Sequence, residues 1–121
     1  MLLLDTHILL FALAGALSPK ETRALARHPW GISAITLWEV AMLARRGRIE
    51  VDLDSPEMAL VLRQVHVWPL DREVCLRIKE LDFSSDPADE IIAATSLAHN
   101  LPLVTRDQKL RASRSIRFAG A

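Results

Sequence analysis

The side chains best suited to chemistry in this sequence are carboxylates placed where predicted strands end and predicted helices begin. Asp5 follows the apolar run 2–4, and Asp107 lies just beyond another apolar run at 101–105. Asp89 falls in the first turn of a predicted helix. In a parallel α/β sheet the carboxyl ends of the strands share one edge, where ligands bind. We therefore expect these three acids to meet there.

Each of these acids also has an ordinary structural explanation. Asp5 could cap the helix that starts at Thr6. Asp89 occupies the third helical position after Asp86, where an acid favours the helix dipole. Asp86 itself is expected to be only a helix cap, and Asp107 suits a turn. Taken one at a time, these positions leave both explanations open.

Glu39 is harder to explain as a structural residue. At about 100° per residue, it lies about 40° from Ile35 and so interrupts the apolar face of its own helix. A carboxylate there needs a partner, because burying an unpaired charge is costly. Either Arg46, two turns further on, or a metal ion could be that partner.

Carboxylates that converge without compensating lysines repel each other, and a divalent cation removes that conflict. Ligation by oxygen alone favours Mg²⁺ or Mn²⁺ over zinc. The four histidines are scattered, and the sequence contains no CxxC, HExxH, P-loop, GxGxxG or GxSxG pattern. The sequence thus predicts a magnesium or manganese site and gives no sign of a nucleotide cofactor or a serine nucleophile.

The elements that must position these acids alternate between strand-like and helix-like segments, which predicts βαβ units. We expect a three-layer α/β/α sandwich with a central, mainly parallel sheet of about five strands, in a single domain over residues 1–121. The predicted strands are 2–5, 30–33, 65–68, 101–105 and 116–118. The predicted helices are 6–14, one opened by Ser18-Pro19, 34–46, 56–64, 71–81 and 86–100.

Composition is that of a compact globular protein, with 121 residues of which 50% are hydrophobic and 25% charged. The formal net charge is zero, whereas a nucleic-acid-binding protein usually has a basic excess. Basic residues nevertheless gather in two places. Arg45, Arg46, Arg106 and Lys109 are candidates for contacts with a phosphate backbone, although solvated surface charge explains them equally well.

Further expectations concern the compartment and the core. The single cysteine, Cys75, excludes an internal disulfide, suits a reducing compartment and is expected to be buried. The N-terminal residues have the pattern of neither a signal peptide nor a membrane span, so we expect a cytoplasmic protein. The larger aromatic residues are expected in the core, with one or two available to a partner: Trp30, Trp38, Trp68 and Phe83.

Four motifs, in this order, resemble those of PIN-domain ribonucleases. They are Leu-Leu-Leu-Asp5-Thr6-His7, Ile-Ser-Ala-Ile-Thr-Leu-Trp-Glu39, Asp86-Pro-Ala-Asp89 followed by Ile-Ile-Ala-Ala-Thr after Glu90, and Leu-Val-Thr105-Arg-Asp107. The similarity spans essentially the whole chain. It is greatest to the VapC toxins of bacterial toxin–antitoxin pairs.

The resemblance implies a PIN-like fold and a Mg²⁺- or Mn²⁺-dependent endoribonuclease that hydrolyses RNA phosphodiester bonds. It also implies a cognate VapB-type antitoxin and a toxin homodimer, with no role for a membrane. Many relatives carry arginine after the third acid, where this chain has Glu90, which puts substrate affinity in doubt. The resemblance assigns metal binding and catalysis to Asp5, Glu39, Asp89 and Asp107, with nearby hydroxyls from Thr6 and Thr105.

Three other functions are compatible with acids at the ends of parallel strands. A catalytically inactive PIN-fold binding or signalling module remains the alternative. A receiver domain should carry paired acids after the first strand and a lysine after the fifth, and this chain, which ends in Phe118-Ala119-Gly120-Ala121, offers neither. A haloacid-dehalogenase-like phosphatase should carry a second aspartate two residues after Asp5, where His7 stands instead.

Overall fold

The computed structural model describes residues 1–119, so the last two residues of the predicted domain lie outside the described part. Its sheet has four parallel strands in the order β3-β2-β1-β4. The strands are β1 (Leu2–Leu4), β2 (Trp30–Ser33), β3 (Val65–Trp68) and β4 (Leu103–Val104). The helices are α1 (Thr6–Leu13), α2 (Pro19–Ala26), α3 (Ala34–Arg45), α4 (Pro56–Gln64), α5 (Arg72–Leu76), the 3₁₀ turn η1 (Ile78–Glu80), α6 (Pro87–His99) and α7 (Gln108–Arg111).

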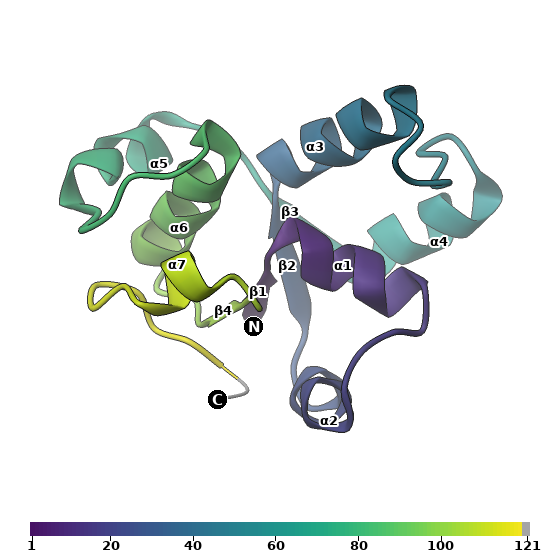
Figure 1. Ribbon diagram of the computed structural model, residues 1–121, viewed down its shortest axis with the longest axis horizontal. Coiled ribbons are helices and arrows are strands. Elements are labelled where there is room, and N and C mark those ends of the chain that lie inside the picture. Colours follow the sequence, from purple (N-terminus) through teal and green to yellow (C-terminus); the bar gives the residue numbers. More distant parts are fainter. Residues whose placement is uncertain (120–121) are drawn as a thin grey trace.

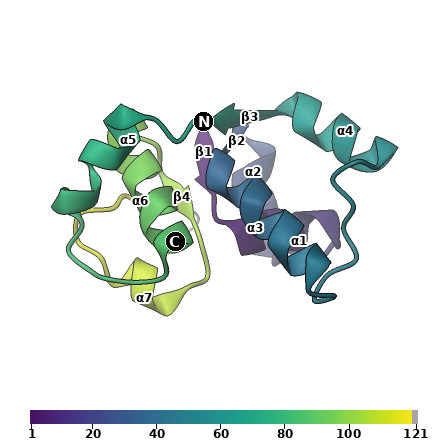
Figure 2. The ribbon, with the colours of Figure 1, turned by 90° about the horizontal axis from the view of Figure 1, so that it is seen from above.

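Helices cover both faces of this sheet, which confirms the three-layer arrangement. Figures 1 and 2 show α5, α6 and α7 on one side of the strands and α1, α3 and α4 on the other. Successive side chains of a strand point to opposite faces. In β1, Leu2 and Leu4 therefore pack with Ile8 and Leu9 in one hydrophobic cluster, while Leu3 packs with α6 in the other.

The helix starts follow caps that the sequence encodes. Ser18 and Glu21 form a reciprocal capping box, with Pro19 in the first turn. Ser55 and Asp71 likewise accept hydrogen bonds from the backbone of the helices they precede. Asp86 precedes α6 but makes no side-chain capping bond, so the expectation that it serves only as a cap is wrong.

The predicted fifth strand is reduced to a single parallel bridge between Phe118 and Leu103. β4 is also shorter than predicted, because Pro102 has no backbone N–H and the Leu101 amide bonds to Ser96 at the end of α6. The helix predicted at 71–81 divides into α5 and η1. The helix α7 was not predicted.

One burial prediction is wrong, and among the four large aromatic residues one is left exposed, as the sequence allowed. Cys75 is exposed, because in the short helix α5 it is the neighbouring Val74 that packs inward. Trp38 is 55% exposed on α3, whereas Trp30, Trp68 and Phe83 are at least partly buried. Among the described residues, no helix is long and apolar enough to span a bilayer.

Gly31 in β2 lies against the indole of Trp68. A Cβ at residue 31 would stand 2.8 Å from Trp68 Nε1 and 2.9 Å from the Met1 sulfur. The indole is held between the rings of His66 and His99, at centroid distances of 4.3 and 4.1 Å. It has little freedom to move aside.

We therefore expect Gly31→Ala to lower the free energy of unfolding by about 1 to 3 kcal/mol through overpacking. Urea denaturation should show a lower midpoint with an unchanged m-value. A double-mutant cycle can combine Gly31→Ala with His66→Ala, because the exposed His66 ring packs against the same indole. If the indole is the obstacle, adding His66→Ala to Gly31→Ala should recover part of the loss, and strict additivity would contradict this account.

Candidate active site

A pocket of about 370 Å³ lies where β1 and β4 end and α6 and α7 begin. It brings together all four acids singled out from the sequence, and Asp86 joins them. The lining residues are Asp5, His7, Phe11, Glu39, Asp86, Asp89, Arg106 and Asp107.

Asp5 and Asp107 are linked through one threonine. The Asp5 amide bonds to the Val104 carbonyl at 3.0 Å, which continues the pairing of β1 with β4. The Thr105 hydroxyl donates to Asp5 Oδ2 at 2.7 Å and accepts from the Asp107 amide at 3.0 Å. Asp5 makes no capping bond to α1, so that alternative is not realised.

Glu39 enters the pocket because α3 follows β2 without a loop. About one and a half turns of helix bring its side chain to the start of α1, where the buried Thr6 hydroxyl donates to Glu39 Oε1. Thr6 Oγ1 also lies 3.0 Å from Thr36 Oγ1. Glu39 forms no ion pair within residues 1–119, so Arg46 is not the partner considered from the sequence.

Asp89 is held by the segment before α6. The Ser85 hydroxyl donates to Asp89 Oδ2 at 2.8 Å. The Ser85 amide donates to Glu90 Oε2 at 2.9 Å, so the carboxylate of Glu90 orders this segment. Sequence reasoning missed the roles of Ser85 and Thr36. Their proximity in sequence to Asp89 and Glu39, respectively, was the available signal.

Asp107 is the N-cap of α7, and its Oδ1 accepts from the amides of Lys109 and Leu110 at 2.8 and 3.2 Å. All four acids thus share one arrangement, in which one oxygen is fixed by the protein. Within residues 1–119 the second oxygen of each accepts no hydrogen bond. The buried unpartnered atoms of the described chain lie elsewhere, so these four oxygens are accessible.

Burial raises the pKa of Asp5, Glu39 and Asp89 above its usual range. Repulsion from Asp5 and Asp89 raises the pKa of Glu39 further, and Asp5, Asp107 and Asp86 do the same for Asp89. The hydroxyl bonds from Thr105, Thr6 and Ser85 oppose these shifts only in part. The pocket therefore concentrates negative charge without neutralising it.

These acids fit a hard divalent cation by their chemistry, since all offer an accessible oxygen and none forms a salt bridge within the described part of the chain. The described residues contain no three His, Cys, Asp or Glu side chains already arranged to hold one ion. A cation held by three of them would thus require their side chains to move from these positions.

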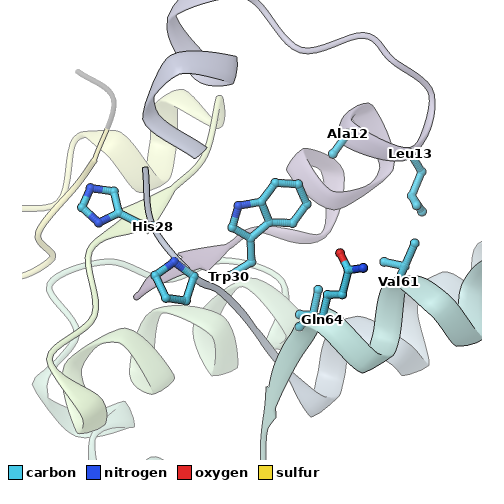
Figure 3. Close-up of a pocket in the computed structure, with 8 residues that line it drawn as sticks. Ala12, Leu13, His28, Trp30, Val61 and Gln64 are labelled. Atoms are coloured by element: carbon cyan, nitrogen blue, oxygen red, sulfur yellow. The ribbon is translucent and has the colours of Figure 1, made fainter. Parts of the chain in front are cut away.

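A second pocket, of about 420 Å³, lies at the opposite edge of the sheet, where β2 and β3 begin (Figure 3). It is lined mainly by apolar side chains, including Leu13, Trp30 and Val61, and its one ionisable group is His28. The Trp30 indole is already bonded to the Leu25 carbonyl at 2.8 Å. This pocket therefore lacks the group of carboxylates that lines the acidic pocket.

Comparison with known proteins identifies a relative by sequence and solved structures with a similar fold. The chain is 30% identical over 119 residues, covering 93% of its own length and 91% of the relative's, to a protein named Ribonuclease VapC22 from Mycobacterium tuberculosis. Its fold is similar to the crystal structure of VapBC2 from Rickettsia felis bound to promoter DNA (TM-score 0.73, 17% identity, 96% of this chain and 95% of that one).

The fold is also similar to the DNA-bound VapBC structure from Salmonella typhimurium, with a TM-score of 0.72, 21% identity and coverage of 98% and 97% of the two chains. The family model described as PIN domain matches residues 2–114, a stretch that includes all four acids of the pocket. The chain belongs to the PIN-domain family.

Proposed function

We propose that this chain is a metal-dependent endoribonuclease that hydrolyses RNA phosphodiester bonds and acts as the toxin of a toxin–antitoxin pair. The observation that carries the proposal is the pocket in which four carboxylates each keep one oxygen anchored and one accessible. Membership of the PIN family and the relative named Ribonuclease VapC22 support it.

Asp5, Glu39, Asp89 and Asp107 would hold the ion, and their all-oxygen chemistry favours Mg²⁺ or Mn²⁺. When bound, such an ion lowers the pKa of water and neutralises charge that develops on a phosphate. Three hydroxyl groups play a positioning role, because their hydrogen bonds fix the orientation of three of these carboxylates. They belong to Thr105, Thr6 and Ser85. The chain's own contribution is positioning, and it requires no histidine base.

The toxin assignment includes an antitoxin and a second toxin copy as partners. It is supported by fold similarity to VapBC structures and by large apolar side chains left exposed, among them Trp38 at 55% and Leu60 at 58%. Trp38 directly precedes Glu39, so a partner seated on this part of α3 would lie beside the acidic pocket.

Asp89→Asn should abolish Mn²⁺-dependent cleavage of total RNA, with a rate loss of more than about a hundredfold, because it removes a charged ligand and keeps the volume. Asp5→Asn should behave in the same way. The exposed Asp54 lies outside the pocket, so Asp54→Asn is the matched control and should cleave like the wild type. Circular dichroism should show all three variants folded, and wild-type cleavage by Asp89→Asn would refute the site.

Glu39→Gln should weaken Mn²⁺ binding about tenfold or more in isothermal titration. It should also raise the melting temperature of the metal-free protein, because it removes a half-buried charge that Asp5 and Asp89 repel. The glutamine oxygen can still accept the Thr6 hydroxyl bond, so the local structure is retained. Unchanged Mn²⁺ affinity would exclude Glu39 as a ligand.

The same carboxyls set the direction of the pH dependence. Their raised pKa values mean that the folded, metal-free protein holds protons more tightly than the unfolded chain. Their contribution to stability is therefore complete below the ordinary carboxyl pKa and is lost as the pH rises through the raised values. Urea midpoints across this window should decline less in Glu39→Gln than in the wild type, and Mn²⁺ affinity should fall on acidification.

Expression of the chain alone should arrest bacterial growth, and co-expression with any small gene found beside its own gene should relieve the arrest if that gene encodes the antitoxin, because a bound antitoxin would block the pocket. Asp89→Asn is the control and should not arrest growth. A wild-type chain that neither slows growth nor cleaves RNA in Mn²⁺ would favour a catalytically inactive binding module.

A further inference from the structure

Arg106 is the only lysine or arginine among the residues that line the acidic pocket. It lies between Thr105, which anchors Asp5, and Asp107. Its side chain stays 42% exposed, so its guanidinium can be reached from solvent. A positive group in this position could meet a ligand that enters the pocket.

The guanidinium is held firmly on one edge. Its Nε and Nη2 donate to the two carboxylate oxygens of Glu21 at 2.8 and 2.7 Å, and Nη2 also donates to the Ala16 carbonyl at 3.0 Å. Its carbon lies 3.9 Å from the centre of the Phe11 ring. The pKa of Glu21 falls to about 2, chiefly through the bond from Arg106, so the pair stays charged at neutral pH.

Counting donors shows what this arrangement leaves available. A guanidinium has five N–H donors, of which Nε supplies one and each terminal nitrogen two. Glu21 and Ala16 use the Nε donor and those of Nη2. Nη1 has no partner among residues 1–119, so two donors remain on an immobilised cation at the pocket.

The ion pair is bidentate and the Glu21 side chain is only 14% exposed, so the pair stabilises the fold, but stability does not require the guanidinium to line the acidic pocket. Arg77 gives the comparison within the chain. It also bonds to carboxylates, those of Glu73 and Glu80, and is similarly exposed, but it lines neither the acidic pocket nor the apolar pocket. Arg106 differs in being anchored from a separate helix, α2, and in facing the acidic pocket.

We propose that Arg106 binds a phosphate of the RNA strand next to the phosphate held at the acids, through the donors of Nη1, with Glu21, Ala16 and Phe11 keeping it in place. The inference rests on the proposed ribonuclease function. Guanidinium groups suit phosphate oxygens in both charge and geometry. A polyanion entering this negative pocket needs such a contact, because the acids repel the parts of the strand that do not touch a metal.

The test is RNA binding measured apart from cleavage. Fluorescence anisotropy with a short fluorescein-labelled single-stranded RNA is read in Ca²⁺, a hard cation that takes oxygen ligands, and a gel verifies that the RNA stays intact. Arg106→Gln should raise the Kd about tenfold and lower the slope of log Kd against log salt by about one. Arg77→Gln removes the same charge elsewhere and should change the Kd by less than about twofold.

Glu21→Gln separates a phosphate contact from a structural role. It breaks the same ion pair but leaves the arginine and removes a negative charge from the rim, so it should bind RNA at least as tightly as the wild type. If the ion pair matters only for local structure, Glu21→Gln and Arg106→Gln should weaken binding alike. Melting temperatures of both variants check that they are folded.

Other outcomes are equally distinct. If the wild type binds and cleaves RNA and Arg106→Gln keeps its Kd and salt slope, this inference is overturned while the proposed function stands. If the wild type neither binds the RNA in Ca²⁺ nor cleaves RNA in Mn²⁺, both are overturned. An equal loss in Arg77→Gln would show that net charge alone governs binding, which also overturns a specific contact.

Discussion

Repulsion among carboxylates gathered at one sheet edge is the constraint on which the rest of this structure depends. Asp5, Glu39, Asp89 and Asp107 share a pocket in which burial and mutual repulsion raise the pKa of three of them. Hydrogen bonds from the protein stabilise each carboxylate, and in each case they reach only one of its two oxygens. The other oxygens remain accessible, and a cation that satisfied them would remove the repulsion.

The fold supplies those hydrogen bonds with short, rigid connections. Thr105 can bond to Asp5 because β1 and β4 are neighbours in parallel register. Thr6 can reach Glu39 because α1 and α3 begin directly after adjacent strands. Every anchoring hydroxyl lies close in sequence to one of the site's acids or to its own strand end. The sheet therefore fixes the positions of these acids and hydroxyls, and long loops play little part.

The rim of the pocket carries one fixed cation. Arg106 is anchored from α2, a helix that carries no acid of the site, so the charge at the rim is set by a different part of the chain from the charge inside. Glu90 belongs to neither set. It orders the segment that carries Ser85, so the negative charge noted in the sequence at this position has a structural use.

The sequence by itself determined four strands, most helices and the four acids that line the pocket, because apolar periodicity, caps and chain order are local properties. Asp5 and Asp107 could be placed at one edge from strand order alone, and Glu39 stood out on an apolar face. Only the tertiary structure decided what depends on contacts distant in sequence. Through such contacts Glu39 accepts a hydrogen bond from Thr6 and does not pair with Arg46, and Arg106 pairs with Glu21. They also reduce the predicted fifth strand to one bridge. No local sequence pattern specifies which hydrogen-bond or ion-pair partner a side chain finds, because that depends on how whole helices and strands pack.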